Sequence, residues 1–148
     1  MKMTFQELIN AWNSINQLAT NADIPSRKAS YAISRMFDIL ESAIKPYNKE
    51  AKKFETDWND LDADKKYKLK EGKTEKEYEE AKEAFLSTEV EVNTYELDIN
   101  ELKDVTLFFG FKQEKISILP IHYRNLKYFI TGEPKFEPEK KPDISPVK

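Results

Sequence analysis

The sequence predicts an α+β protein that is mainly α-helical, and two observations carry this prediction. The first is an apolar stripe from Ala29 to Leu61, whose members recur every three or four residues and so share one side of a helix. The second is a change to alternating apolar residues after Ser87, which indicates short strands. We expect a long kinked helical hairpin, an N-terminal helix, a small antiparallel sheet and a short C-terminal helix.

Length and composition suit one modest domain. The chain has 148 residues, of which 39% are hydrophobic and 34% charged, and it has no cysteine. The missing cysteines exclude disulfides, thiolate nucleophiles and cysteine-ligated zinc. No run approaches the ~18 apolar residues of a membrane span, and the N-terminus lacks the apolar core of a signal peptide. We therefore expect a domain over residues 1–132, a proline-spaced extended tail over 133–148, and no membrane segment.

The N-terminal helix is predicted to begin at Thr4, because Thr4 and Glu7 have the spacing of a capping box. The second helix carries the long stripe and is expected to have Pro25 in its first turn. Pro46 lies inside the stripe without changing its phase, which predicts one bent helix with a kink near Ser42.

The segment 59–73 is polar and contains Gly72, and we expect a loop or a frayed helical turn there. Thr74 and Glu77 form a second capping box, which predicts a third helix antiparallel to Tyr47–Leu61. Beyond it, alternation predicts two to four short strands between residues 88 and 118. A last short helix is expected from Pro120 to Phe129 or Ile130.

Charge is unevenly distributed along the chain, although the net charge is only −3. Lys65–Lys73 holds five lysines and one glutamate, whereas Glu75–Glu101 holds ten acids and two lysines. These segments are either solvated surfaces or a docking surface for a charged partner. Nucleic acid is a poor candidate, because the chain is acidic and its lysines are neither joined by arginines nor interleaved with several aromatics.

The tail has two interpretations, a disordered segment or an extended segment that docks on a partner through its apolar residues. The residues that we expect to bind a partner are Lys65, Lys66, Lys68, Lys70, Lys73, Phe136 and Ile144. Phe37 and Ile39 widen the apolar face of the long helix, and this excess meets either the N-terminal helix or a second copy of the chain. A homo-oligomer is therefore also predicted.

Few residues suggest catalysis or metal binding. His122 is the only histidine and has no serine and acid near it in sequence, so a hydrolase using His122 is a remote alternative. Asp60, Asp62, Asp64 and Glu71 have calcium-loop spacing, but Lys65 stands where that loop needs glycine. We expect no enzyme activity, no metal and no cofactor.

Three segments together resemble a family of small phage and prophage proteins that is known only as a domain of unknown function. They are Lys45-Pro46-Tyr47, the strand entry Glu89–Val92 and, in degenerate form, Ala29–Arg35. The resemblance spans roughly Phe5 to Phe129, and Gly110–Leu119 departs from the family pattern. It implies a phage origin, a helical hairpin with small strands, and no catalytic residues to carry over.

The expected function is therefore that of a non-enzymatic phage accessory protein that binds a host or phage protein. Such a protein can be host-directed, as an inhibitor or adaptor that acts, for example, against a defence system. The alternative is a virion or assembly component, such as a chaperone, adaptor or minor structural protein. With the phage resemblance, the expected location is the host bacterial cytoplasm or, for the alternative, the virion.

Overall fold

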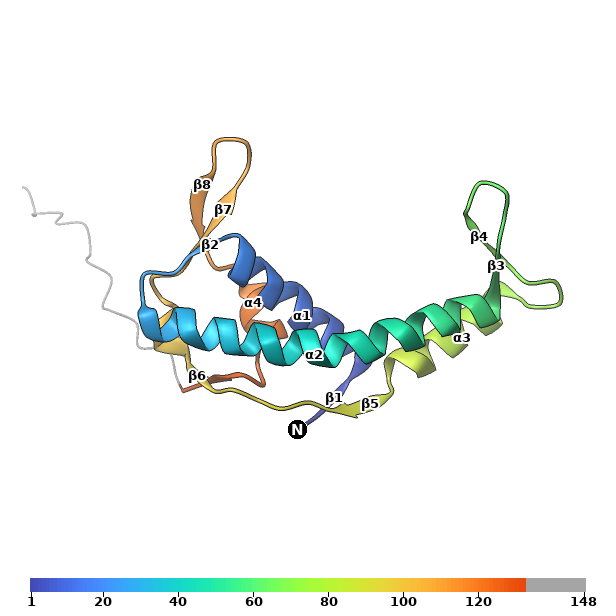
Figure 1. The fold of residues 1–148 in the computed structure, drawn as a ribbon, viewed down its shortest axis with the longest axis horizontal. Coiled ribbons are helices and arrows are strands. Elements are labelled where there is room, and N and C mark those ends of the chain that lie inside the picture. The colour runs from blue at the N-terminus through green and yellow to red at the C-terminus, as the bar shows by residue number, and fades with distance from the viewer. Residues whose placement is uncertain (133–148) are drawn as a thin grey trace, which may run out of the picture.

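Helix α2 (Arg27–Trp58) runs through the whole molecule in the computed structural model, which describes residues 1–132 (Figure 1). Helix α1 (Phe5–Thr20) packs against its first half, and α3 (Glu75–Leu86) lies beside its second half. We call the first part the body, and the second part, α2 beyond Ile44 with α3, the arm. The predicted fold class, mainly helical with small antiparallel sheets, is confirmed.

The start of α1 confirms the predicted capping box. The Thr4 hydroxyl accepts a hydrogen bond from the Glu7 amide at 3.1 Å, and the Glu7 carboxylate accepts one from the Thr4 amide at 3.1 Å. Two of the amides that a helix start leaves unpaired are thereby satisfied. The buried side of α1 then faces α2 and includes Leu8, Ile15 and Leu18.

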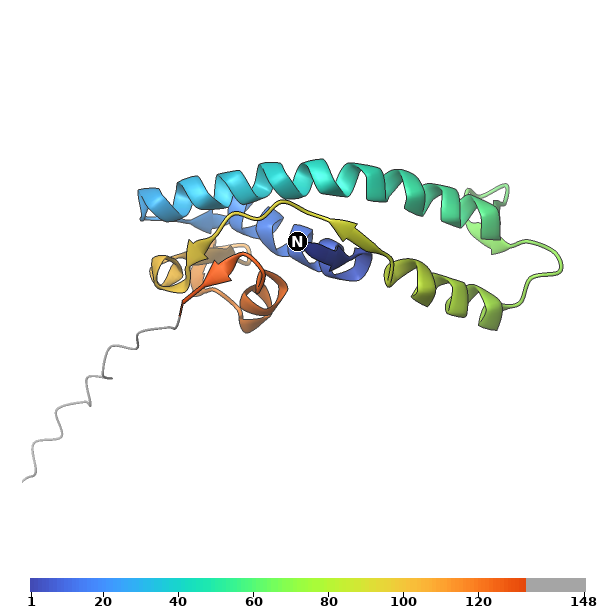
Figure 2. The same ribbon diagram turned by 90° about the horizontal axis from the view of Figure 1, so that it is seen from below.

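Helix α2 starts two residues later than predicted. Pro25 precedes the helix, and Ser26 caps it, with its hydroxyl accepting from the Ala29 amide at 3.1 Å. A serine cap satisfies a free amide, which proline in the first turn does not do. The helix continues through Pro46 as a single element, as predicted, and Figure 2 shows it bowed along its length.

The arm confirms the predicted helical hairpin and is held together by aromatic rings. Phe54 of α2 stacks on Phe85 of α3 with 4.9 Å between ring centroids, and Tyr78 lies 5.9 Å from Phe54. The Tyr78 hydroxyl donates to Glu55 at 2.7 Å; burial and this carboxylate raise the pKa of Tyr78 to about 12. Phe5 joins the body to the arm, 5.0 Å from Phe85.

The segment predicted as a loop or frayed turn is a β-hairpin, so that prediction is wrong. Strand β3 (Asn59–Leu61) pairs antiparallel with β4 (Tyr67–Leu69) directly after α2 ends. The Asp62 side chain accepts from the amides of Asp64 and Lys66, both at 2.9 Å, and so closes the turn without glycine.

The strands of the described residues form four small sheets, where the sequence suggested one sheet. Strand β5 (Glu89–Glu91) pairs with β1 (Lys2–Thr4) at the N-terminus. Strand β7 (Thr106–Phe109) pairs with β2 (Ala22–Asp23) on one side and β8 (Glu114–Ser117) on the other. The partners β1 and β2 come from distant parts of the chain, which local alternation does not reveal.

The chain after β5 covers the body on the side opposite the two projecting hairpins (Figure 1). Strand β6 (Leu97–Asp98) pairs parallel with β9 (Ile130–Thr131), and a 3-10 helix η1 (Ile99–Leu102) follows β6. Helix α4 (Pro120–Asn125) ends earlier than predicted, because Ile130 leaves the helical path to pair with Leu97.

The hydrophobic core lies in the body. Along α2 the buried residues end at Ile44, and within the described range of α3, Glu75–Leu86, no residue is buried. Phe37, which motivated the prediction of a homo-oligomer, packs on Trp12 with 5.2 Å between rings, and Ile39 packs on the core. Phe37 and Ile39 are thus covered by residues of the same chain, and the homo-oligomer stays a prediction.

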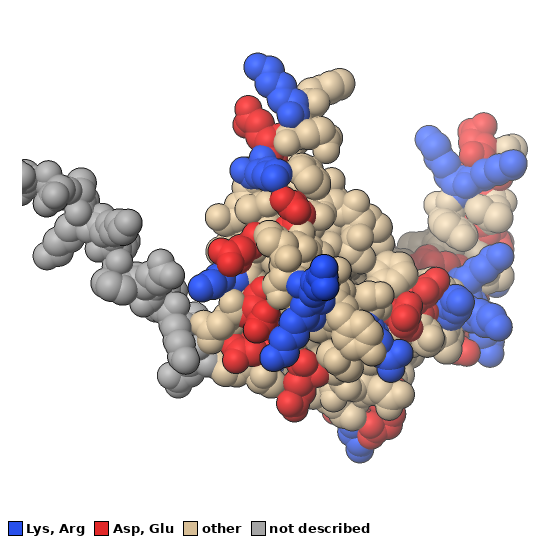
Figure 3. Space-filling view, turned by 60° about the vertical axis from the view of Figure 1, so that its left-hand side comes forward, with Lys and Arg blue, Asp and Glu red and all other residues tan. Residues whose placement is uncertain are grey.

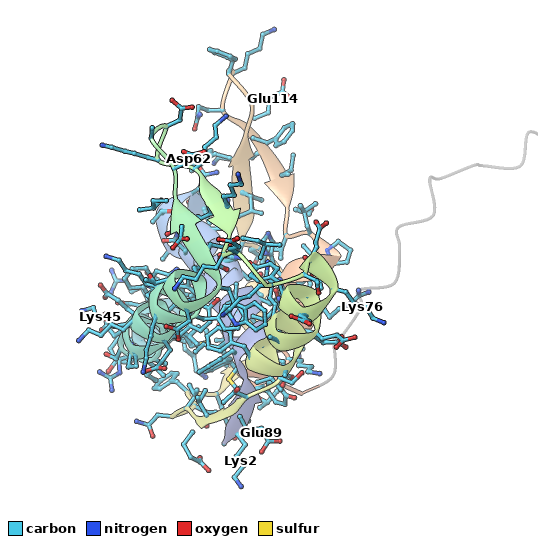
Figure 4. All side chains as sticks on the ribbon, turned by 90° about the vertical axis from the view of Figure 1, so that its right-hand side faces the viewer. Lys2, Lys45, Asp62, Lys76, Glu89 and Glu114 are labelled. Carbon is cyan, nitrogen blue, oxygen red and sulfur yellow. The ribbon has the colours of Figure 1, made fainter. Side chains whose placement is uncertain are left out.

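The two hairpins, β3–β4 and β7–β8, project from the same side of the molecule at opposite ends of α2 (Figure 1). A view along the arm agrees, because Asp62 and Glu114 both lie on that side (Figure 4). Among the described residues, none of the helices has the length and apolar character needed to cross a bilayer.

Candidate functional site

The tip of the β7–β8 hairpin presents two exposed phenylalanines. Phe109 ends β7 and is 67% exposed, and Phe111 in the turn is fully exposed. Gly110 has a φ of +76° between them, a conformation that glycine adopts without strain, and its carbonyl accepts from the Gln113 amide at 3.2 Å. The turn therefore holds both rings outside the core.

The base of this hairpin is fixed to the body. Lys115 forms an ion pair with Asp23 at 2.8 Å, and the Asn21 side chain donates to the Phe108 carbonyl at 2.8 Å. Leu107, on the same strand as Phe109, is buried in the core. The hairpin is thus anchored at its base, while its tip projects into solvent.

The tip of the β3–β4 hairpin also exposes apolar side chains. Leu61 and Tyr67 are cross-strand partners, and they are 63% and 55% exposed. The Lys65 backbone has a φ of 59°, which turns the chain between the two strands. This tip therefore combines an apolar pair with lysines.

The structure places the five predicted lysines in different surroundings. Lys65, Lys66 and Lys68 are exposed on the β3–β4 hairpin, and Lys70 is half-buried. Lys73 is used within the chain, because its ammonium donates to the Asp57 carbonyl at 2.7 Å and lies 4.2 Å from the centre of the Trp58 ring. Lys73 therefore ties the hairpin to the end of α2.

Phe136 and Ile144, the other predicted binding residues, lie outside the described residues. Sequence reasoning missed the exposed aromatic and aliphatic side chains at the hairpin tips. It assigned Leu61 to the apolar stripe of the long helix, which is wrong, because the helix ends at Trp58 and Leu61 lies exposed in β3. It assigned Tyr67 to a loop, and Phe109 and Phe111 to strands. A phenylalanine within a turn signal, as in Phe109-Gly110-Phe111, was the available clue. A turn tip cannot reach the core of a small domain, so such a residue is expected to be exposed.

Lysine, acidic and uncharged side chains occur together at the β7–β8 hairpin, which projects upward in the space-filling view (Figure 3). Lysines and acids occur together at the β3–β4 hairpin, so neither tip is strongly of one sign. Apolar contact is therefore the larger contribution that these tips can make to binding.

His122 lies in a buried polar contact between α4 and α1. Its Nδ1 is 2.8 Å from the Ser14 hydroxyl, to which the Asn125 amide donates at 3.0 Å. While it accepts from Asn125, the Ser14 hydroxyl either donates to Nδ1 of a neutral imidazole or accepts from it, depending on the tautomer. Burial lowers the pKa of His122, which favours this neutral form.

This serine–histidine pair bears on the remote hydrolase alternative. A nucleophilic serine must meet its substrate, but Ser14 is only 1% exposed. The contact suits a structural role, in which it joins α4 to α1. Among residues 1–132, no group of three or more His, Asp or Glu side chains could hold a metal ion, and Asp62 of the calcium-like spacing is used in its turn.

The free energy of unfolding is expected to fall as the pH drops from about 7 to about 5. In this range the unfolded chain binds a proton at His122 near the ordinary pKa of histidine, whereas the folded chain binds it only at lower pH because burial lowers the pKa of His122. The contribution of neutral His122 to the free energy of unfolding is complete above pH ~6.5. It declines as the pH falls toward the lowered pKa of the folded state, by at most about 1.4 kcal/mol per pH unit. Urea unfolding across this range measures it. The His122→Asn variant should show a flatter profile, and an unchanged slope would contradict the assignment.

Comparisons of the chain with protein-family models, with curated proteins and with solved structures find no match. Its function is therefore inferred from its own residues.

Proposed function

We propose that this protein is a non-catalytic phage accessory protein that binds another protein through its hairpin tips. The exposure of Phe109 and Phe111 on an anchored hairpin carries the proposal. Burying an exposed phenylalanine contributes about 1.5–3 kcal/mol, and aromatic residues are enriched among those that dominate protein interfaces. Two adjacent rings on a projecting turn are therefore a strong anchor for a partner.

The shared direction of the hairpins supports one extended binding side. Leu61 and Tyr67 project on the same side as Phe109 and Phe111, at the other end of α2 (Figure 1). Two anchors on one rigid scaffold add their contributions when the partner reaches both. The second anchor is flanked by exposed lysines, Lys65, Lys66 and Lys68, and by exposed aspartates on the same hairpin, so a partner with charges of both signs suits it.

The phage origin and the host-cytoplasmic location rest on the family resemblance. The partner is then a host protein, whose inhibition or diversion would serve the phage, or a phage protein. A virion or assembly role would use the same tips, and the identity of the captured partner separates the two. Self-association is a further part of the proposal and would use a surface separate from the hairpin tips.

Replacing Phe109 and Phe111 together with serine should abolish partner capture and leave the melting temperature unchanged, because neither ring belongs to the core. The measurement is affinity purification of the tagged chain from infected bacterial cells with quantitative mass spectrometry. Ile121→Ser is the matched control, because Ile121 is also exposed at 52% but lies on α4.

Three outcomes are informative. A host protein lost only with the double variant supports the host-directed role, and a virion protein lost in the same way supports assembly. Identical capture by the double variant and the wild type would overturn the tip proposal.

A further inference from the structure

The outer side of α2 in the arm carries a face of lysines. Lys45, Lys49, Lys52 and Lys53 are exposed, and their spacing of three and four residues places them on one side of the helix. Viewed along the arm, Lys45 points away from α3 (Figure 4). We call these four residues the lysine face.

Repulsion on the lysine face centres on Lys49, because Lys45 and Lys53 each also have an acidic residue four positions away, Glu41 and Asp57. Lys45 and Lys49, and then Lys49 and Lys53, are like charges four residues apart, an arrangement that destabilises a helix. The ion pairs described within residues 1–132 join other residues. Glu55 is turned inward, since its carboxylate accepts from Tyr78 at 2.7 Å and from the Asn59 side chain at 2.9 Å. A partner with negative charge would offset this repulsion.

Helix α3 supplies the complementary surface. It carries five glutamates and two lysines. Glu79, Glu80 and Glu83 line an open groove of about 500 Å³ where α3 meets the start of α1. Leu86 contributes an apolar side to this groove, whose other lining residues are Thr4, Gln6, Lys76, Lys82 and Ser87. Lysines suit such a groove, because their aliphatic stems cover apolar surface while the ammonium groups reach the carboxylates.

We infer that the lysine face of one copy docks on the Glu79–Glu83 groove of a second copy. Lys45 and Lys76 point to opposite sides of the arm, so the outer sides of α2 and α3 face in opposite directions (Figure 4). Each copy then offers one surface to the copy before it and the other to the copy after it. Such heterologous contacts build a head-to-tail series.

Individual exposed ion pairs contribute little, so this contact needs several pairs at once and weakens as salt screens them. The inference takes up the self-association predicted from the sequence but places it on the arm. It does not involve the hairpin tips, so its failure would leave the proposed partner binding standing.

Sedimentation of the full chain provides the first test. At low salt (about 50 mM) the mean mass should rise with protein concentration, and at about 500 mM it should return to that of one chain. A single-chain mass at every concentration in low salt would overturn the inference, as would association that salt does not weaken.

Charge reversal provides the decisive test. One variant combines Lys45→Glu, Lys49→Glu and Lys53→Glu, and the other combines Glu79→Lys, Glu80→Lys and Glu83→Lys. Each variant alone has two surfaces of the same sign and should lose association, whereas an equimolar mixture should regain it, because each variant then complements the other. Circular dichroism checks that both fold.

The control variant reverses Lys103 and Lys112, which are exposed outside the lysine face, and should associate as the wild type does. A mixture of the two charge-reversed variants that stays at the mass of one chain would overturn the inference.

Discussion

Replacing Phe129 with alanine is expected to lower the free energy of unfolding by about 3–5 kcal/mol. Phe129 is fully buried, and it packs in the core together with Leu126 and Leu97. Its carbonyl accepts from the Leu97 amide at 2.8 Å where β9 meets β6, so the cavity would lie beside the parallel pairing that closes the body. Small domains are stable by only about 5–15 kcal/mol in total, so much of the population could unfold.

Urea unfolding followed by circular dichroism measures this effect, and Phe111→Ala is the matched control. Phe111 is the same residue type but fully exposed, so its loss should change stability by less than about 0.5 kcal/mol. A cost below about 1 kcal/mol for Phe129→Ala would contradict the described packing.

Replacing Phe54 with alanine is expected to open the arm without unfolding the body. Phe54 contacts Phe85 at 4.9 Å, Tyr78 at 5.9 Å and Trp58 at 6.2 Å between ring centroids. Burial of a phenylalanine contributes about 1.5–3 kcal/mol when complete, and each aromatic pair about 0.5–1.5 kcal/mol more. Because Phe54 is half-buried, we expect a total of roughly 2–4 kcal/mol, concentrated in the arm.

Hydrogen exchange resolved along the chain measures this local opening. Amides of α3 should exchange more than about tenfold faster in Phe54→Ala, since about 1.4 kcal/mol corresponds to a factor of ten, while those of α1 stay protected. Phe54→Leu keeps an apolar side chain, so the exchange rates of its α3 amides should lie between those of the wild type and those of Phe54→Ala. Equal acceleration in α1 and α3 would show that body and arm unfold as one unit.

The two tryptophans report the two parts separately. Trp12 packs on Phe37 in the body, and Trp58 lies in the arm beside Phe54. In the Phe54→Ala variant, the fluorescence of Trp58 should change at a lower urea concentration than that of Trp12. A Trp58→Phe background isolates the signal of Trp12.

Features written in short stretches of sequence were predicted correctly. The capping boxes at Thr4 and Thr74 use residues three apart, so local spacing was sufficient. The phase of the apolar stripe across Pro46 likewise indicated one continuous helix, because a helix face is defined by its own residues. The pairing of the arm followed from two such stripes on consecutive helices, although the connection between them contains the β3–β4 hairpin.

Features that depend on distant partners were not predictable in the same way. Strand β5 pairs with β1 across a long stretch of chain: Thr4 and Glu89, the pair nearest in sequence, are 85 residues apart. The tertiary fold sets this pairing. The hairpin at residues 59–73 was missed because its strands are short and polar. The exposed tips were missed because Phe109 and Phe111 alternate as core residues do, and alternation does not tell whether a strand extends beyond the core.

The sequence by itself determined the three long helices and the capping boxes at Thr4 and Thr74, because those depend on neighbours within a few residues. It did not determine the start of α2 or the end of α4. Only the tertiary structure decided which apolar residues the core covers. Phe37 is covered because Trp12 packs on it, whereas Phe111 is left in solvent. Burial is a property of the packed whole, since a side chain leaves water only where other elements reach it. The proposed binding surfaces follow from that difference.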